Sequence, residues 1–134
     1  MIDFVVVKRN LTVGSAPGEK FMLRLFRGPM VSQNELCSFI SESTTLSRGE
    51  VKLVVDQLQF YIRKFCSNSQ AVKLDDLGIF APRLQVKAVN TPGEATADTI
   101  RRKSVIFRPC VELQNFMNQA EAQKKDLTIM GLQQ

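Results

Sequence analysis

The chain has 134 residues, of which 44% are hydrophobic and 23% charged, a composition typical of one soluble globular domain with a short extension. Its formal net charge of +5 and isoelectric point of about 9.4 favour a polyanionic partner, either nucleic acid or an anionic membrane surface. The sequence has no histidine and three widely spaced cysteines, which argues against a zinc site, a disulfide framework and a histidine-assisted nucleophile.

Two strands are predicted near the N-terminus. Phe4 and three consecutive valines predict a strand over residues 4–7, and alternating apolar side chains predict a second over 20–27. The glycines and proline between them indicate a loop over 10–19. We therefore expect a β extension, residues 1–29, packed on the rest of the protein.

Two helices with defined starts follow. Ser32 and Ser47 each stand three residues before a glutamate, which is the capping-box pattern. After Ser47, apolar residues recur at helical spacing up to Phe65, and Phe60 beside this stripe indicates a second apolar surface. One small chain cannot cover so much apolar surface, so we expect the helix over 47–66 to form the core of a dimer. The stripe consists of Val51, Val54, Val55, Leu58, Tyr61, Ile62 and Phe65.

The second half of the sequence predicts a β-ribbon and a last helix. Short strands are expected over 72–74, from Ile79 onward and over 100–108, with a turn-like excursion centred on 90–93. Pro82 lies within the outgoing strand and must therefore sit at an edge or a bulge.

Single glycine, proline and cysteine positions and the C-terminal segment give further expectations. Gly78 is expected in a turn that needs a positive φ, and Pro109 in the first turn of the last helix, where its missing N–H costs nothing. The three cysteines, Cys37, Cys66 and Cys110, are expected to be free and mostly buried. Residues 121–134 are expected to form a polar tail, with a further strand over 127–130 as the alternative.

This order of elements resembles HU and integration host factor. The resemblance rests on Leu74-Asp75-Asp76-Leu77-Gly78-Ile79-Phe80, on the basic ribbon, and on Phe107-Arg108-Pro109 before the last helix, and it covers residues 30–120. The two N-terminal strands resemble the extension of HU-related proteins of the Bacteroides group. The resemblance implies an α+β fold and an intertwined homodimer, in which a helical body and sheets carry two β-ribbon arms that wrap the DNA minor groove.

Basic side chains gather in the ribbon. Residues 79–108 carry six basic and two acidic side chains, a net +4, whereas residues 32–66 carry four of each. Each Lys or Arg that neutralises a phosphate releases a condensed counterion and adds affinity. Alternation places Arg101 and Lys103 on one face of the return strand and Arg102 on the other. The predicted DNA-binding residues are Arg83, Lys87, Asn90, Pro92, Arg101, Arg102, Lys103 and Arg108.

The tip of the ribbon departs from the ordinary HU pattern. Residues 90–98 contain Glu94 and Asp98 and no basic residue, and Cys110 replaces the glycine often found after the Phe-x-Pro motif. Pro92 is either an apolar wedge between base steps or simply a turn proline. The acidic tip favours the alternative function, an HU-fold interaction module with weak or no DNA binding.

The main hypothesis is architectural, largely sequence-independent binding of double-stranded DNA by a histone-like, nucleoid-associated homodimer in the cytoplasm, with possible DNA bending. No enzyme is expected, because the adjacent Asp75 and Asp76 side chains diverge and the absence of histidine rules out a Ser–His or Cys–His pair. We also expect no cofactor, metal or small-molecule substrate. The N-terminal apolar run is too short for a signal peptide, and no run approaches the ~20 residues of a membrane span.

Overall fold

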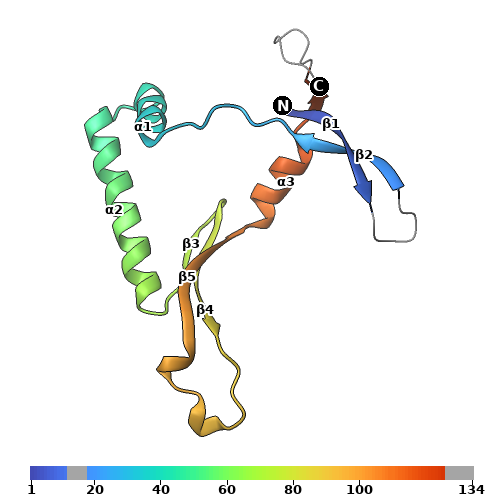
Figure 1. Cartoon of the computed structure of the whole chain (residues 1–134). Coiled ribbons are helices and arrows are strands. Elements are labelled where there is room, and N and C mark those ends of the chain that lie inside the picture. Colours follow the sequence, from blue (N-terminus) through green and yellow to red (C-terminus); the bar gives the residue numbers. More distant parts are fainter. Residues whose placement is uncertain (12–17, 126–134) are drawn as a thin grey trace. The chain divides into compact units, whose positions relative to one another are not determined.

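The computed structural model describes residues 1–11 and 18–125, which belong to two compact units (Figure 1). The first unit combines Met1–Met30 with the chain from Met117 onward, and the second is Val31–Phe116. Within the described residues, three α-helices and two three-stranded sheets are present, so the α+β class is confirmed.

The first unit contains a sheet with strand order β2-β1-β6. Strand β1 (Ile2–Leu11) and strand β2 (Gly18–Leu25) form the antiparallel hairpin that the sequence predicts. Strand β6 (Ala122–Lys124) lies parallel to the start of β1, within the segment expected to be a polar tail. The alternative strand over 127–130 and most of the expected loop, residues 12–17, lie outside the described residues.

The second unit begins with two capped helices, α1 (Gln33–Glu42) and α2 (Arg48–Ser67). The Ser32 hydroxyl accepts a hydrogen bond from the Glu35 N–H at 3.2 Å, which satisfies one of the free donors at the start of α1. At the start of α2 both halves of the capping box are present, since the Glu50 carboxylate also accepts from the Ser47 N–H. The predicted helix starts are confirmed.

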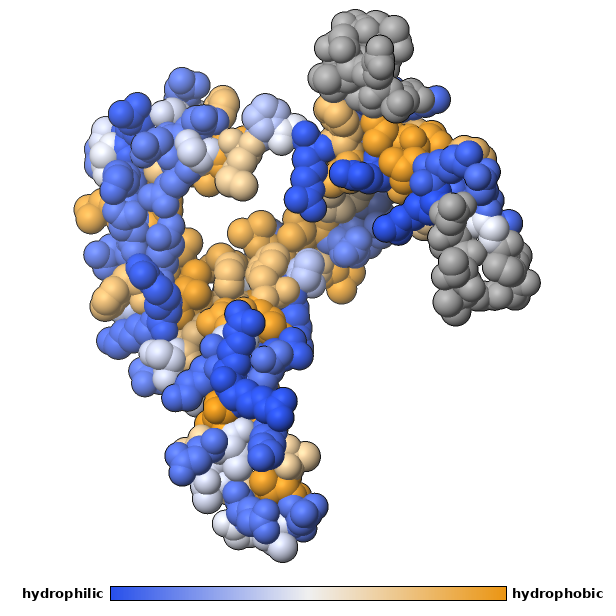
Figure 2. Space-filling view, viewed as in Figure 1, coloured by the Kyte–Doolittle hydropathy of each residue, from blue (hydrophilic) through white to orange (hydrophobic). Residues whose placement is uncertain are grey.

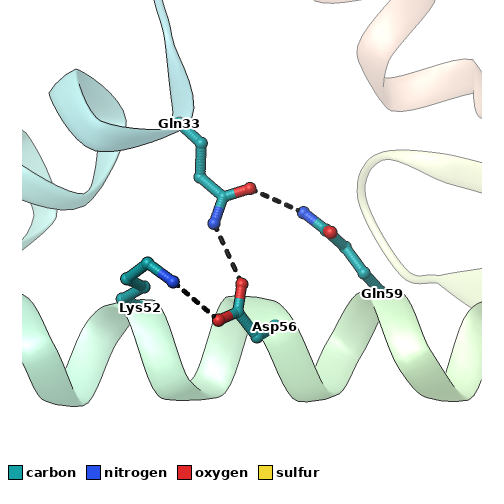
Figure 3. Close-up of polar contacts among 4 residues, drawn as sticks. All are labelled: Gln33, Lys52, Asp56 and Gln59. Atoms are coloured by element: carbon teal, nitrogen blue, oxygen red, sulfur yellow. Dashed lines mark hydrogen bonds and ion pairs between the residues drawn. The ribbon is translucent and has the colours of Figure 1, made fainter.

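A polar cluster ties the start of α1 to the middle of α2 (Figure 3). The Gln33 Nε2 group donates to Asp56 Oδ1 at 3.1 Å, and Gln59 Nε2 donates to Gln33 Oε1 at 2.8 Å. Lys52 Nζ lies 3.0 Å from Asp56 Oδ2. These hydrogen bonds, from Lys52 first and then Gln33, lower the pKa of the Asp56 carboxyl. Because this pKa is lowered, the ionised Asp56 carboxylate stabilises the fold at neutral pH. That contribution to stability is lost as the pH falls through the lowered pKa.

The sheet of the second unit has strand order β3-β4-β5, all antiparallel. Strand β3 (Val72–Leu74) pairs with the first three residues of strand β4 (Gly78–Val86), and strand β5 (Ile100–Pro109) pairs with β4 along its length. Beyond Phe80, β4 therefore has one described neighbour, β5. Pro82 lies in this edge segment, where a missing N–H is tolerated, as the sequence predicts.

The last helix, α3 (Val111–Gln119), starts two residues later than the sequence predicts. Pro109 is the final residue of β5, opposite Gly78, and the Cys110 N–H donates to the Leu77 carbonyl at 2.9 Å. Cys110 then caps α3, because its carbonyl accepts from the Gln114 N–H at 3.0 Å and its Sγ from the Leu113 N–H at 3.4 Å. The expectation that Pro109 opens the helix is wrong, since sheet pairing extends through it.

Gly78 is required for space more than for its backbone angle. Its φ is positive, as expected, but at 159° it is nearly extended. A Cβ placed there would collide with the Arg108 carbonyl oxygen and would lie 2.7 Å from the Phe107 ring. Backbone and a packed ring cannot move aside cheaply, so this close approach fixes glycine at the start of β4.

We therefore expect Gly78→Ala to destabilise the protein by about 2–3 kcal/mol, because the extra methyl group overpacks the β4–β5 contact. Urea unfolding followed by circular dichroism measures this. The matched control is Gly49→Ala in the first turn of α2, where a Cβ would meet nothing within 4 Å and alanine is the better helix former. Equal stability of the two variants would contradict the steric explanation.

The single chain leaves most apolar side chains of the second unit uncovered. Among the described residues, the buried hydrophobic side chains are Cys37, Val51 and Cys66. The expected free thiols are confirmed, with Cys37 and Cys66 buried and Cys110 partly buried. Apolar side chains reach the surface along α2 (Figure 2). The exposed ones on this helix are Leu53, Val54, Leu58, Phe60, Tyr61 and Phe65, of which Leu53 and Val54 are 62% and 60% exposed.

Candidate nucleic-acid interface

Strands β4 and β5 run side by side toward a tip (Figure 1), and their register sorts the side chains into two faces. Partners across an antiparallel ladder share a face, and neighbours along each strand alternate. The apolar face of the ribbon consists of Phe80, Pro82, Leu84, Lys103, Val105 and Phe107. The basic face of the ribbon consists of Ile79, Ala81, Arg83, Gln85, Arg102, Ser104, Ile106 and Arg108.

The ribbon lies next to the end of α2. The Cys66 thiol on α2 donates to the Phe80 carbonyl at 3.7 Å, and the Phe80 and Phe107 rings pack with centroids 4.9 Å apart. A groove of about 750 Å³ runs between the two elements, with Arg63 and Cys66 on the helix side and Pro82 and Val105 among its ribbon residues. Arg83 and Ser104 of the basic face line this groove as well, so the cross-strand register, and not the groove, separates the two faces.

The basic face presents three arginines that lack a carboxylate partner within the described chain. Arg83, Arg102 and Arg108 are all exposed. The ion pairs among the described residues are Lys8–Glu19, Lys52–Asp56 and Lys125–Asp3, none of them on the ribbon. Arg83 is opposite Ser104 and Arg102 is opposite Gln85, so the two arginines are diagonal neighbours with Cβ atoms roughly 7–8 Å apart. Their charges are therefore free to meet phosphates.

Two predicted DNA-binding residues on β5, Arg101 and Lys103, are not among the residues of the basic face. The register places Lys103 on the apolar face, opposite Leu84, which agrees with the predicted alternation against Arg102. Arg101 has no partner, because the register shifts from Gln85↔Arg102 to Val86↔Ile100. This bulge redirects the strand, so the predicted shared face of Arg101 and Lys103 does not follow from alternation.

Three further predicted residues, Lys87, Asn90 and Pro92, lie at or near the tip of the ribbon, away from Arg83, Arg102 and Arg108. The Lys87 N–H donates to the Thr99 carbonyl at 2.8 Å and closes the ladder. Beyond it the chain forms two 3₁₀ turns, η1 (Pro92–Glu94) and η2 (Ala97–Thr99). Asn90 and Pro92 are exposed there, in the same short segment as the acidic side chains. The structure thus groups Arg83, Arg102 and Arg108, and it places Asn90 and Pro92 outside that group.

Gln85 was missed as a candidate. It lies on the basic face, directly opposite Arg102, and it can donate to a phosphate oxygen through its amide. Its two-residue spacing from Arg83 was the signal in the sequence that could have identified it.

In the part of the chain that the structure describes, no group of acidic, Cys or His side chains could hold a metal ion. No helix there is long and apolar enough to cross a membrane.

Comparison with known proteins adds a family and a structural neighbour. A family model described as HU-HIG, "HU domain fused to wHTH, Ig, or Glycine-rich motif", matches residues 1–124. A solved structure from Bacteroides vulgatus, described as a "Putative bacterial DNA binding protein", matches 92% of this chain with a TM-score of 0.67 and 10% identity. At that identity the likeness shows the fold alone. The match covers 47% of the Bacteroides vulgatus chain, so this chain spans about half the length of that protein. The search of curated proteins found no match.

Proposed function

Because this chain belongs to the HU-HIG family, we propose that it binds double-stranded DNA through the basic face of its β4–β5 ribbon. The observation that carries the proposal is the set of three exposed arginines, Arg83, Arg102 and Arg108, on one face without carboxylate partners among the described residues. Such cations bind the phosphate backbone, which positions a protein on DNA and carries no sequence information directly. Binding is then largely independent of sequence. The description of the Bacteroides vulgatus neighbour as a DNA-binding protein supports this choice of ligand.

The proposal includes a homodimer. On α2, Val54, Leu58, Tyr61 and Phe65 follow one another at helical spacing and are exposed in the single chain. On the apolar face of the ribbon, Leu84, Val105 and Phe107 are exposed as well. Soluble monomers rarely leave a continuous apolar surface of this extent open. A second copy that covers α2 and the apolar face leaves both basic faces free for DNA, consistent with the intertwined dimer that the resemblance implies.

The proposed role is architectural: a histone-like, nucleoid-associated protein of the cytoplasm, and a binding protein rather than an enzyme. The stem of the ribbon, not its tip, supplies the affinity. Glu94 and Asp98 follow Pro92 by two and six residues, and phosphates repel them. Any bending of the DNA by Pro92 as a wedge therefore adds little to the affinity.

The test measures binding by fluorescence anisotropy over a series of salt concentrations, with two duplexes of equal length and unrelated sequence. Three arginines per chain give about six phosphate contacts per dimer, so we expect a log–log slope of affinity against salt near −5 and similar affinity for both sequences. A slope near zero, or strong preference for one duplex, would contradict the proposal. A folded dimer that fails to bind at low salt would instead favour the protein-interaction module that the acidic tip suggests.

A further inference from the structure

The N-terminal hairpin of the first unit also has two unlike faces. Of the β1 residues 4–9, three lie on each side of the sheet, each opposite a residue of β2. The first side holds Phe4, Val6 and Lys8 opposite Leu25, Leu23 and Phe21. The other side, here called the hairpin basic face, holds Val5, Val7 and Arg9 opposite Arg24, Met22 and Lys20.

The hairpin basic face keeps two like charges directly opposite each other. Arg9 and Lys20 are cross-strand partners and both are exposed. Like charges at directly opposite positions destabilise a sheet, unless an anion lies between them. Residues 12–17, which join the strands, contribute no charged side chain in the sequence. The hairpin thus carries an electrostatic cost that a bound anion would remove.

The nearby carboxylates are already engaged elsewhere. Glu19 lies on the opposite face and forms an ion pair with Lys8 at 3.1 Å. Asp3, at the far end of the hairpin basic face, accepts from Gln123 Nε2 at 2.7 Å and lies 3.8 Å from Lys125 Nζ. Arg9, Lys20 and Arg24 therefore have no carboxylate partner among the described ion pairs.

The cations are spaced for an extended ligand. Lys20 and Arg24 are four residues apart on β2, about 13 Å along a strand, with the apolar pair Val7 and Met22 between them. A groove of about 450 Å³ lies along the two strands, lined by Val7, Arg9, Met22 and Arg24 of the hairpin basic face and also by Lys8 and Leu23 of the other side. A single small anion cannot reach cations at both ends of this face, whereas a chain of phosphates can.

We propose that the hairpin basic face is a second, separate contact surface for the phosphate backbone of duplex DNA. The inference shares with the proposed function the choice of ligand, but it concerns different residues in a different unit of the fold. Duplex DNA is the occupant chosen because it is also the ligand proposed for the ribbon of this same chain. Phe21 and Leu23, 70% and 65% exposed, lie on the opposite face from the cations, an amphipathic arrangement that also suits a membrane surface, and the vesicle arm of the test decides between the two.

The test compares two double variants of the full chain that each remove two positive charges. Arg9→Gln/Arg24→Gln changes the hairpin basic face. Arg27→Gln/Lys124→Gln is the control, because Lys124 is the β6 partner of Phe4 on the other side of the sheet and Arg27 lies beyond the end of β2. At about 50 mM salt the first variant should bind a duplex roughly tenfold more weakly than the parent, with a shallower salt slope, whereas the control should stay close to the parent. Circular dichroism checks that both variants fold.

A third variant, Arg83→Gln/Arg102→Gln, separates this inference from the proposed function. If it binds weakly and the hairpin variant binds like the parent, the inference is overturned and the ribbon stands. If the ribbon variant binds like the parent and the hairpin variant weakly, the inference stands and the ribbon proposal falls. A parent that does not bind duplex DNA overturns both. The last arm of the test uses vesicles that contain an anionic lipid. If the parent binds vesicles in preference to DNA, and the hairpin variant loses this binding, the face binds a membrane and the inference is overturned.

Discussion

Leu58→Glu should break the proposed homodimer. Leu58 lies in the middle of the exposed α2 stripe, 41% exposed in the single chain, and the proposed second copy would bury it. A glutamate there must lose its hydration or its charge when the dimer forms, at a cost of about 3–5 kcal/mol per chain. Light scattering should give twice 15.1 kDa for the parent at low micromolar concentration and the mass of one chain, or an unfolded species, for the variant.

The control for this experiment is the neighbouring substitution Gln59→Glu. It adds the same charge one residue along the helix, away from the stripe, and removes one exposed hydrogen bond to Gln33. It should remain dimeric. A parent that is a stable monomer with full helical content would contradict the dimer. A Leu58→Glu variant that is dimeric and as stable as the parent would place the interface elsewhere.

Local chemistry made much of this fold predictable. The helix starts at Ser32 and Ser47 follow from side-chain hydrogen bonds within four residues, so sequence spacing is enough to find them. The hairpin strands and the edge position of Pro82 likewise follow from alternation and from a missing donor. Each of these features depends on neighbours in the chain, which the sequence displays directly.

Features that depend on distant partners were predicted poorly or missed. Strand β6 is a short polar segment with little intrinsic strand preference, and it is a strand because its backbone pairs with β1 more than a hundred residues away, as the hydrogen bond between Gln123 and Asp3 (separation 120) illustrates. Pro109 ends a strand instead of opening a helix because Cys110 bonds across to Leu77. In both cases tertiary hydrogen bonds decide the outcome.

The candidate site shows the same division. The clustering of basic residues in the ribbon is visible in the sequence, and so is the acidic tip. Which arginines share a face is not, because it depends on register across two strands and on the bulge at Arg101. Arg83 and Arg102 are nineteen positions apart in the sequence, and only the pairing of β4 with β5 makes them diagonal neighbours. The pairing of Arg9 with Lys20 was missed for the same reason.

Because the register puts Arg83 and Arg102 on one face, we expect a large loss of DNA affinity when both charges are removed. The double variant Arg83→Gln/Arg102→Gln removes four phosphate contacts from the proposed dimer, and it should bind duplex DNA about a hundredfold more weakly at low salt. The log–log salt slope should become shallower by roughly 3 to 4. Glutamine keeps the length and a donor, so the change tests the charge rather than the packing.

Lys103→Gln, compared with the single variant Arg102→Gln, gives the sharpest check of this prediction. The two residues are adjacent on β5 and carry the same charge, but Lys103 is on the apolar face, opposite Leu84, and Arg102 is on the basic face, opposite Gln85. If the basic face meets the DNA, Arg102→Gln should weaken binding and reduce the salt slope, while Lys103→Gln should leave both close to the parent. Equal losses would show that general positive charge, not one face of the ribbon, attracts the DNA. A loss confined to Lys103→Gln would put the DNA on the apolar face of the ribbon, and the proposed dimer would then have to leave that face open.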